Sequence, residues 1–444
     1  MARLLCVPVA VFLLVLSLAQ PGSGAELPAL SLSMGEAISQ ALQANFHIEV
    51  AATRISESQG AYDRRLASLL PRVRLETPLA YQTRNLKAQG ISMPNLPSVV
   101  GPFTSYDFRG YAEQALLDLQ SWHNLRASEK TQTVRRNEYE DVRSAAIRQV
   151  AAQYLSAQYA QAQVETAASR VRTAEVLEKL ARDRREAGTA DGLDLLRAQV
   201  QLANDRQNLL VTQNAVQQSL LLLARLLGMD LGTPIILTDK LNFQACDAPR
   251  IEQAVTAALK SRADYRALLA QREVLEEQLK ANRSRYLPKL VLSGNYGDSG
   301  QELGDMEPSG AIQANLIFNV FDMDRHGERQ EIDSLLKRVD NQIEDQRRGI
   351  EQDIREALLN LESAAQQVEV AQGGVGLAER ELTFARDRFR HGVTNNIEVI
   401  TAQDALARAQ DNRLHALARH ADAKIALARA LGATENVYRL FLGI

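Results

Sequence analysis

The chain has 444 residues, and its 51 lysines and arginines nearly balance its 54 aspartates and glutamates, for a formal net charge of −3. This length allows two or three ordinary domains or one unusually long one. The near balance of charge excludes the strongly basic surface that binds nucleic acid, so we expect no nucleic-acid partner.

Residues 1–25 are typical of a secretory signal peptide. Arg3 precedes an apolar run over 4–19, and the small residues Ser23 and Ala25 suit a signal-peptidase site. The alternative is a membrane anchor, but the apolar run is short for a membrane span. We therefore expect the chain to be exported and the segment to be removed.

The rest of the chain limits how it could enter a membrane. No later stretch has enough uninterrupted apolar residues for a transmembrane helix. If the exported chain enters a membrane, it must therefore do so through strands. Cys6 lies in the predicted signal peptide and Cys246 is the second of two cysteines, so no intrachain disulfide is expected.

The remaining chain contains one structural unit twice. Residues 182–228 recur as 386–432, an offset of 204, and residues 37–71 recur as 254–288, an offset of 217. The two offsets differ because a turn-rich loop in the first half is longer than its counterpart. A repeat at so large an offset indicates one structural half made twice, not a solenoid of short units.

The predicted elements follow the same order in both halves. The first half, residues 26–228, is predicted to contain a helix over 37–69, strands over 72–82 and 104–117, a long helix over 120–187 and a return helix over 193–227. A linker over 229–250 follows. The second half, residues 251–432, is predicted to contain a helix over 251–286, strands over 289–297 and 311–321, a long helix over 328–391 and a return helix over 397–431, before a C-terminal tail over 433–444.

The predicted strands have one apolar and one polar face. After Pro71, which ends the first helix, Val73 and Leu75 alternate with Arg72 and Arg74. The other predicted strands alternate in the same way. Such two-faced strands are typical of a sheet that lies between two unlike solvents.

Each half then continues as a helix of unusual length. Residues 120–187 contain neither proline nor glycine before the turn at Gly188, and a helix of about 65 residues is roughly 100 Å long. Its thin apolar stripe is rich in alanine, as at Ala146, Ala151 and Ala157, which indicates closely packed helices like those of coiled coils. Each long helix and its return helix therefore predict an antiparallel hairpin.

Four two-faced strands cannot close a barrel within one chain. An open sheet edge in lipid leaves unpaired backbone groups, each costing several kcal/mol. Two copies would give about eight strands, the size of the smallest bacterial barrels, and three copies about twelve. The chain must therefore oligomerise if its strands span a membrane.

In this ordered set of features the chain resembles the TolC-type outer-membrane efflux protein family. The resemblance covers nearly the whole mature chain and rests on the duplicated halves, the Leu-Pro entries into the strands, and the paired tip segments 188–199 and 392–403. It implies a mainly α fold with a small β part. In that fold the helical hairpins form an α-barrel, and each of three chains contributes four strands to a twelve-stranded transmembrane β-barrel.

The resemblance also implies a function and partners. The chain would be a homotrimeric, passive exit duct in the outer membrane of a Gram-negative bacterium, with a helical tunnel through the periplasm. It would work with a periplasmic adaptor (membrane fusion protein) and an inner-membrane pump, in efflux or in type I secretion. The sequence does not separate small-molecule efflux from protein secretion.

The resemblance places a gate at the hairpin tips. Asp194 and Glu398 each follow a tip glycine by six residues, and their rings of carboxylates would favour cations in the lumen. The alternative role is structural, because a carboxylate in the first helical turn caps backbone N–H groups and suits the helix dipole. Asp191 and Asn395 would then be the N-caps, and the two roles can coexist.

Further candidates surround the gate. By the same resemblance the periplasmic adaptor would dock on the hairpin tips; the alternative is that these residues only form turns. The candidate docking residues are Gly188, Thr189, Gly392, Val393 and Thr394. Phe389 and Arg390 beside the tip either brace the closed state or merely pack.

On the polar strand face, Arg72, Arg74, Asp107 and Arg109 are expected to line the lumen without a role in selectivity.

No enzyme site is expected. The sequence contains no nucleophile–base arrangement or phosphate-binding loop, and its six histidines lack the spacing of metal ligands. We therefore expect no cofactor and no metal. The competing hypothesis is a periplasmic coiled-coil adaptor or another structural interaction protein, but an adaptor would carry one hairpin flanked by compact β domains, whereas this chain carries two complete halves.

Overall fold

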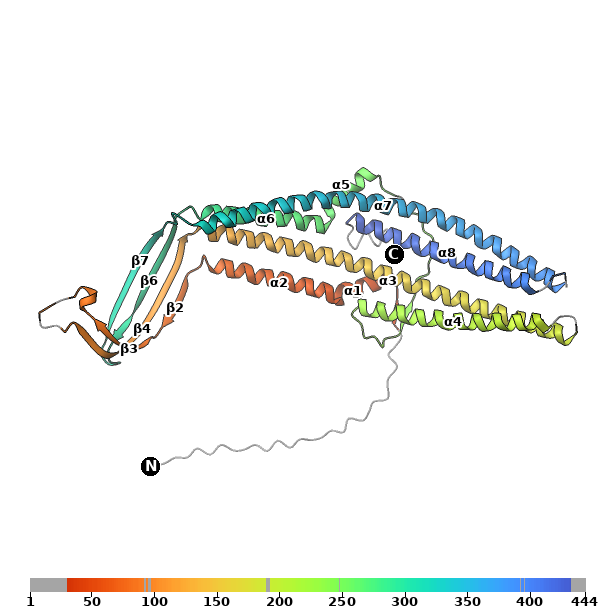
Figure 1. Ribbon diagram of the computed structural model, residues 1–444, viewed down its shortest axis with the longest axis horizontal. Coiled ribbons are helices and arrows are strands. Elements are labelled where there is room, and N and C mark those ends of the chain that lie inside the picture. Colours follow the sequence, from red (N-terminus) through yellow and green to blue (C-terminus); the bar gives the residue numbers. More distant parts are fainter. Residues whose placement is uncertain are drawn as a thin grey trace, which may run out of the picture.

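The structure is a computed structural model, which describes residues 30–91, 93–94, 97–188, 192–246, 248–391, 393–394 and 396–432. The predicted signal peptide over 1–25 and the predicted tail over 433–444 lie outside these residues. The described chain is elongated, with a small sheet at one end and the tips of two helical hairpins at the other (Figure 1).

The described elements follow the predicted order. The first half contains β1 (Leu30–Leu32), α1 (Met34–Ala44), α2 (Phe46–Ala67), β2 (Arg72–Glu76), β3 (Leu79–Asn85), the short 3-10 helix η1 (Lys87–Gln89), β4 (Val99–Leu117), α3 (Leu119–Glu186) and α4 (Gly192–Leu226). The linker contains β5 (Ile235–Leu237). The second half contains α5 (Ile251–Ser261), α6 (Ala263–Ser284), β6 (Lys289–Gly300), β7 (Met306–Ile317), α7 (Met323–Arg390) and α8 (Asn396–Ala430).

The duplication is visible in the helix lengths. α1 and α5 both have 11 residues, and α2 and α6 both have 22. α3 and α7 have 68 residues each, and α4 and α8 have 35 each. The bounds of the short helices coincide at an offset of 217 and those of the hairpin helices at an offset of 204, which are the offsets of the sequence repeat.

The prediction of a single helix over 37–69 is wrong, because the helix is interrupted at Asn45 and continues as a second helix. The backbone of Asn45 is extended (φ −74°, ψ 123°), which ends α1. Its side-chain oxygen accepts from the N–H of His47 at 2.9 Å and so caps α2. Its amide donates to the carbonyl of Leu226 at 2.8 Å, so the break is stabilised by the end of α4.

The single helix expected over 251–286 is wrong for a related reason. Arg262 stands at the position equivalent to Asn45 and is also extended (φ −63°, ψ 122°). Its buried guanidinium binds the carboxylates of Asp264 and Asp353, both at 2.7 Å. Next to it, the Ser261 hydroxyl donates to the carbonyl of Leu431 at 2.7 Å, so this break also receives the end of a return helix.

The strand expected over 72–82 is also divided. β2 and β3 are separated at Thr77 and Pro78, where the proline nitrogen carries no hydrogen for the ladder. Both segments pair with β4, one after the other, so the antiparallel sheet is four strands wide in the order β2/β3, β4, β6, β7. β4, β6 and β7 differ from the expected bounds of 104–117, 289–297 and 311–321 by three to five residues at some ends.

The register of the sheet separates an apolar face from a polar face. Directly paired residues lie on the same face of an antiparallel sheet. Across all four strands, one row of the apolar face contains Val73, Ala112, Gly294 and Ile312, and one row of the polar face contains Arg72, Glu113, Ser293 and Gln313. The apolar face is open: Leu75 is 82% exposed and Ile312 is 85% exposed. Both outer edges, β2/β3 and β7, have no strand partner among the described residues.

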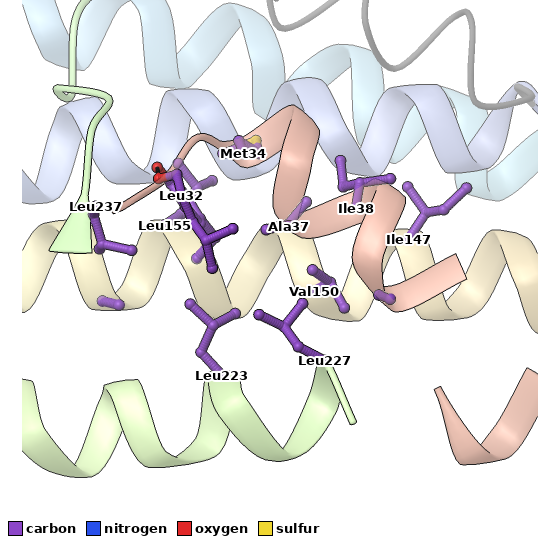
Figure 2. Packing of buried hydrophobic residues seen from close by; sticks show 14 of the residues in the cluster. Leu32, Met34, Ala37, Ile38, Ile147, Val150, Leu155, Leu223, Leu227 and Leu237 are labelled. Atoms are coloured by element: carbon purple, nitrogen blue, oxygen red, sulfur yellow. Dashed lines mark hydrogen bonds between the residues drawn. The ribbon is translucent and has the colours of Figure 1, made fainter. Parts of the chain in front are cut away.

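A hydrophobic core near the middle of the long axis joins the first half to the linker. Figure 2 shows Leu32, Ile38 and other residues of β1 and α1 packed against α3 and the end of α4. Leu223 of α4 and Leu227, the residue that follows this helix, are fully buried there, which stabilises the fold by about 2 kcal/mol per side chain. The hydroxyl of Tyr154 on α3 donates within this core, at 2.9 Å from the carbonyl oxygen of Leu32.

This core contains a small sheet that the sequence did not predict. β1 and β5 pair in parallel, with Leu30, Ser31 and Leu32 opposite Ile235, Ile236 and Leu237. The pair fastens the start of the first half to the linker between the halves. Strands of three residues are too short to give a period, which is why the sequence pattern missed them.

Candidate functional site

The two hairpin tips lie together at the end of the molecule opposite the sheet (Figure 1). Gly188 follows the end of α3 in the left-handed conformation (φ 71°), which favours glycine, and its N–H donates to the carbonyl of Arg185 at 3.0 Å. In the second tip the exposed Val393 donates its N–H to the carbonyl of Arg388 at 3.0 Å, and Thr394 is half-buried. Of the candidate docking residues, Thr189 and Gly392 lie outside the described part of the chain, as do the expected caps Asp191 and Asn395.

The two candidate gate carboxylates occupy equivalent positions but different surroundings. Asp194 and Glu398 both lie in the first turn of a return helix, where the helix dipole favours negative charge. The Asp194 side chain is 17% exposed, and its Oδ1 lies 3.8 Å from Nη1 of Arg197 on the same helix. The Glu398 side chain is 47% exposed, and its Oε2 lies 3.4 Å from Nε of Arg388 on α7. Glu398 is therefore the more accessible of the two carboxylates.

An apolar cluster beneath the tips holds the hairpins together. Leu177 of α3 packs with Leu382 and Phe389 of α7 and with Val399 of α8. The guanidinium of Arg184 lies over the Phe389 ring, 4.7 Å from its centroid, and donates to the Phe389 carbonyl at 3.2 Å. Phe389 is therefore a packing residue at the join between the hairpins.

Arg390, which the sequence paired with Phe389, does not share this role. It is exposed and lies 3.9 Å from Asp387 on the same helix.

Farther along the helices, polar contacts join α3 to both return helices. Nη2 of Arg170 on α3 lies 3.1 Å from Asp205 on α4 and 3.4 Å from Asp404 on α8. The sequence pattern missed this bridge, because it depends on which helix faces meet.

A second polar contact lies nearby. The hydroxyl of Tyr159 lies 2.6 Å from Nε2 of His415 on α8. Burial raises the pKa of Tyr159, and the charge of Asp411 raises it further. Burial likewise raises the pKa of Asp411, although Arg170 and His415 act in the opposite direction.

The polar face of the sheet carries its own network. Nε of Arg109 lies 3.2 Å from Asp107, and its Nη1 and Nη2 donate to Asn295 and Ser309, both at 2.7 Å. Arg74, one row nearer the helices, lies 2.8 Å from Glu76. The polar residues singled out from the sequence thus lie on one face, where carboxylates partner two of the arginines.

Two findings bear on other kinds of site. Among the described residues, no group of three or more His, Cys, Asp or Glu side chains is placed to hold a metal ion. Within the same residues, no helix is both long enough and apolar enough to cross a membrane.

The described chain thus combines an open two-faced sheet at one end with two long helical hairpins at the other. The sequence profile described as "Outer membrane efflux protein" matches residues 37–229 and 254–433, so the chain belongs to the outer membrane efflux protein family. It is therefore an outer-membrane protein of a family of efflux channels, which favours the channel hypothesis over a periplasmic adaptor. The predicted fold class, mainly α with a small β part in duplicated halves, is confirmed.

Two relatives carry the same printed description, "Pyoverdine export outer membrane protein OpmQ". The protein from Pseudomonas putida is 23% identical over 397 residues, which span 87% of this chain and 82% of the relative. The protein from Pseudomonas aeruginosa is 24% identical over 266 residues. That match spans 58% of this chain and only about half of the relative, 55% of its length.

Solved structures have the same fold. The Campylobacter jejuni CmeC outer membrane channel matches with a TM-score of 0.81 at 16% identity, over 90% of this chain and 85% of that chain. A membrane protein from Pseudomonas aeruginosa matches with a TM-score of 0.80 at 18% identity, over 90% and 93%. At these identities the likeness establishes the architecture alone.

Proposed function

We propose that three copies of this chain form a passive exit duct, with a closed β-barrel in the outer membrane and a helical tunnel in the periplasm. The single observation that carries the proposal is the sheet, which exposes its apolar face and, among the described residues of one chain, leaves both edges unpaired. Unpaired edges in lipid cost several kcal/mol per backbone group, and closure by further copies removes that cost. A periplasmic adaptor and an inner-membrane pump open the duct at the hairpin tips.

The tips form the cation-selective constriction of this duct. Glu398 supports the role best, because its carboxylate is exposed at the end of the hairpin; Asp194 contributes from a more covered position. Repeated by three copies, these carboxylates concentrate negative potential around one opening. The adaptor docks on the turns that contain Gly188, Val393 and Thr394, together with Thr189 and Gly392.

The cargo class we propose is a small molecule. The printed names of both relatives assign them to pyoverdine export, so export of small molecules stands ahead of protein secretion for this chain. Deletion of the gene is then expected to lower the extracellular yield of a small secreted metabolite and leave the amounts of secreted proteins unchanged. Loss of a secreted protein instead would favour the secretion alternative.

Ion selectivity in planar lipid bilayers tests the constriction. Glu398→Gln combined with Asp194→Asn is expected to lower the cation-to-anion permeability ratio, measured from the reversal potential in a KCl gradient, several-fold. Glu344→Gln, on α7 away from the tip, is the control, because it also removes one exposed carboxylate. Equal ratios in wild type, tip variant and control would leave Asp194 and Glu398 with a capping role only.

A further inference from the structure

We propose that the C-terminal segment 439–441 lies in a cavity beside α7, in the place that β5 takes in the first half. The cavity has a volume of about 530 Å³ and is lined mainly by the linker and α7. The proposed contact is made within one chain, so it does not depend on the number of copies in the duct. It follows from the duplication, because the tail after α8 is the counterpart of the linker after α4.

One wall of the cavity corresponds to the face of α3 that β5 covers. In the first half, β5 belongs to one buried cluster with three residues of α3, namely Tyr154, Leu155 and Ala157. The offset of 204 converts these three positions to residues 358, 359 and 361 of α7. All three are leucines, and all three line the cavity.

A second wall corresponds to β1 and the start of α1. Residues 31, 32 and 34 become residues 248, 249 and 251 at the offset of 217. These are Ala248, Pro249 and Ile251, and they also line the cavity. In the first half β5 pairs with β1 and packs against α3. The cavity is therefore bounded by the counterparts of both elements that hold β5.

The counterpart face on α7 is uncovered among the described residues. Leu155 on α3 is 5% exposed, whereas the equivalent Leu359 on α7 is 66% exposed. Between 30 and 432 no described strand of the second half takes the place of β5. An apolar wall of this kind is stabilised when an apolar segment removes it from water.

The tail has the length to reach the cavity. Gly228 and Gly432 follow the two return helices with nearly the same φ, 67° and 66°. Six residues, 229–234, connect Gly228 to β5, and six residues, 433–438, connect Gly432 to the proposed segment. The same length of chain therefore covers the same interval in both halves.

The side chains of the segment suit the cavity. In β5 the first and third residues are buried, whereas Ile236 between them is 53% exposed. The same alternation directs Arg439 and Phe441 into the cavity and Leu440 away from it. Phe441 then packs against the leucines of α7.

Arg439 needs an anionic partner in a covered position, and Glu362 supplies one. Glu362 lines the cavity and forms no ion pair with another described residue. The equivalent positions in the first half hold the neutral residues Ile235 and Gln158. The second half thus has opposite charges at two positions where the first half has none, and the proposed contact pairs them.

The natural Cys246 reports whether the segment is docked. Cys246 lines the cavity and is partly buried, so a docked segment slows its reaction with a maleimide–polyethylene glycol reagent. Phe441→Asp places a charge in the apolar cavity and is expected to raise the labelling rate of the purified oligomer about five-fold or more. Leu440→Asp is the matched control, because this side chain points away from the cavity, and its rate should equal that of the wild type.

A charge exchange tests the ion pair. Arg439→Glu is expected to raise the rate of Cys246 labelling about five-fold, because it places a second carboxylate beside Glu362. Addition of Glu362→Arg is expected to restore the rate of the wild type. A general loss of stability would not be reversed by the second charge change, so a double variant that labels as fast as Arg439→Glu would reject the pair.

Disulfide trapping tests the same contact with the segment intact. In a Cys246→Ser background, Leu359→Cys with Phe441→Cys is expected to form a disulfide within one chain, seen as a faster monomer on non-reducing SDS gels. Leu359→Cys with Leu440→Cys is the control and should form much less. A covalent dimer would place the segment of a neighbouring copy in the cavity and overturn the contact within one chain.

Two further results together reject the inference. They are a wild-type labelling rate in Phe441→Asp and the absence of a disulfide in the matched pair. Both can occur in a protein that still forms heat-labile oligomers and bilayer channels, so this failure would leave the proposed duct intact.

Discussion

At the scale of residues, α8 buries two basic side chains, His420 and Lys424, one helical turn apart. His420 is 3% exposed and its ring lies 4.7 Å from the ring of Phe243 in the linker, measured between centroids. The ammonium group of Lys424 donates to the carbonyl of Gln244 at 3.3 Å. Burial lowers the pKa of His420, and the neighbouring charge of Lys424 lowers it further. The folded chain therefore favours neutral His420.

This pKa shift predicts a dependence of stability on pH. A group whose pKa is lowered on folding stabilises the protein fully above its unfolded pKa, about 6.5 for histidine, and that stability is lost as pH falls through the folded pKa. The apparent melting temperature of the wild type should accordingly fall between pH 7.5 and pH 5. His420→Phe keeps an aromatic ring against Phe243 without a titrating group, so its melting temperature should fall less.

The exposed His47 on α2 offers a matched control, since His47→Gln should retain the slope of the wild type. Parallel slopes for all three proteins would show that His420 does not set the pH dependence.

At the scale of elements, the two halves form the same contact between helix ends but use different side chains for it. The end of each return helix meets the break between two short helices, at Asn45 in the first half and at Ser261 and Arg262 in the second. Gly228 and Gly432 follow those helix ends with φ of 67° and 66°. Both halves therefore need a left-handed glycine after the return helix, whereas the side chains that contact the helix end differ between the halves.

Gly228 provides the prediction at this scale. A Cβ at this position would lie 2.2 Å from the carbonyl oxygen of Ala44, and its φ is one that other residues rarely adopt. Gly228→Ala is expected to destabilise the fold by about 1–3 kcal/mol, measured as a lower apparent melting temperature.

Gly60 inside α2 is the control, because a Cβ there would meet no atom within 4 Å. Gly60→Ala should raise the melting temperature slightly, since alanine favours a helix by about 1 kcal/mol over glycine. A neutral Gly228→Ala variant would contradict the close packing at Ala44.

At the scale of the whole molecule, one side chain reaches both hairpins. Arg170 of α3 bridges Asp205 in its own hairpin and Asp404 in the other. The Asp205 side chain is only 6% exposed, so loss of the cation would leave a covered carboxylate without this partner. If opening of the duct separates the hairpins, this bridge opposes opening.

Arg170→Met is therefore expected to raise the open probability in bilayer recordings several-fold. Arg206→Met is the matched control, because Arg206 pairs with Glu175 and joins α4 to α3 within one hairpin. A similar rise in both variants would indicate general loosening of the helices. If the open probability of Arg170→Met did not rise, the bridge would have no role in holding the duct closed.

The sequence by itself determined the duplication, the change of period after Pro71, the two faces of the strands and the lengths of the hairpins. These features depend on residues that are close together along the chain, because helix and strand periodicity and the backbone effects of proline and glycine are local. Only the tertiary structure decided the breaks at Asn45 and Arg262, the pairing of β1 with β5, and the bridge from Arg170 to both hairpins. Each of these includes a contact between groups distant along the chain: Asn45 and Leu226 are 181 residues apart, Arg262 and Asp353 are 91 apart, and Arg170 and Asp404 are 234 apart. Local periodicity does not determine which distant faces of the chain will meet.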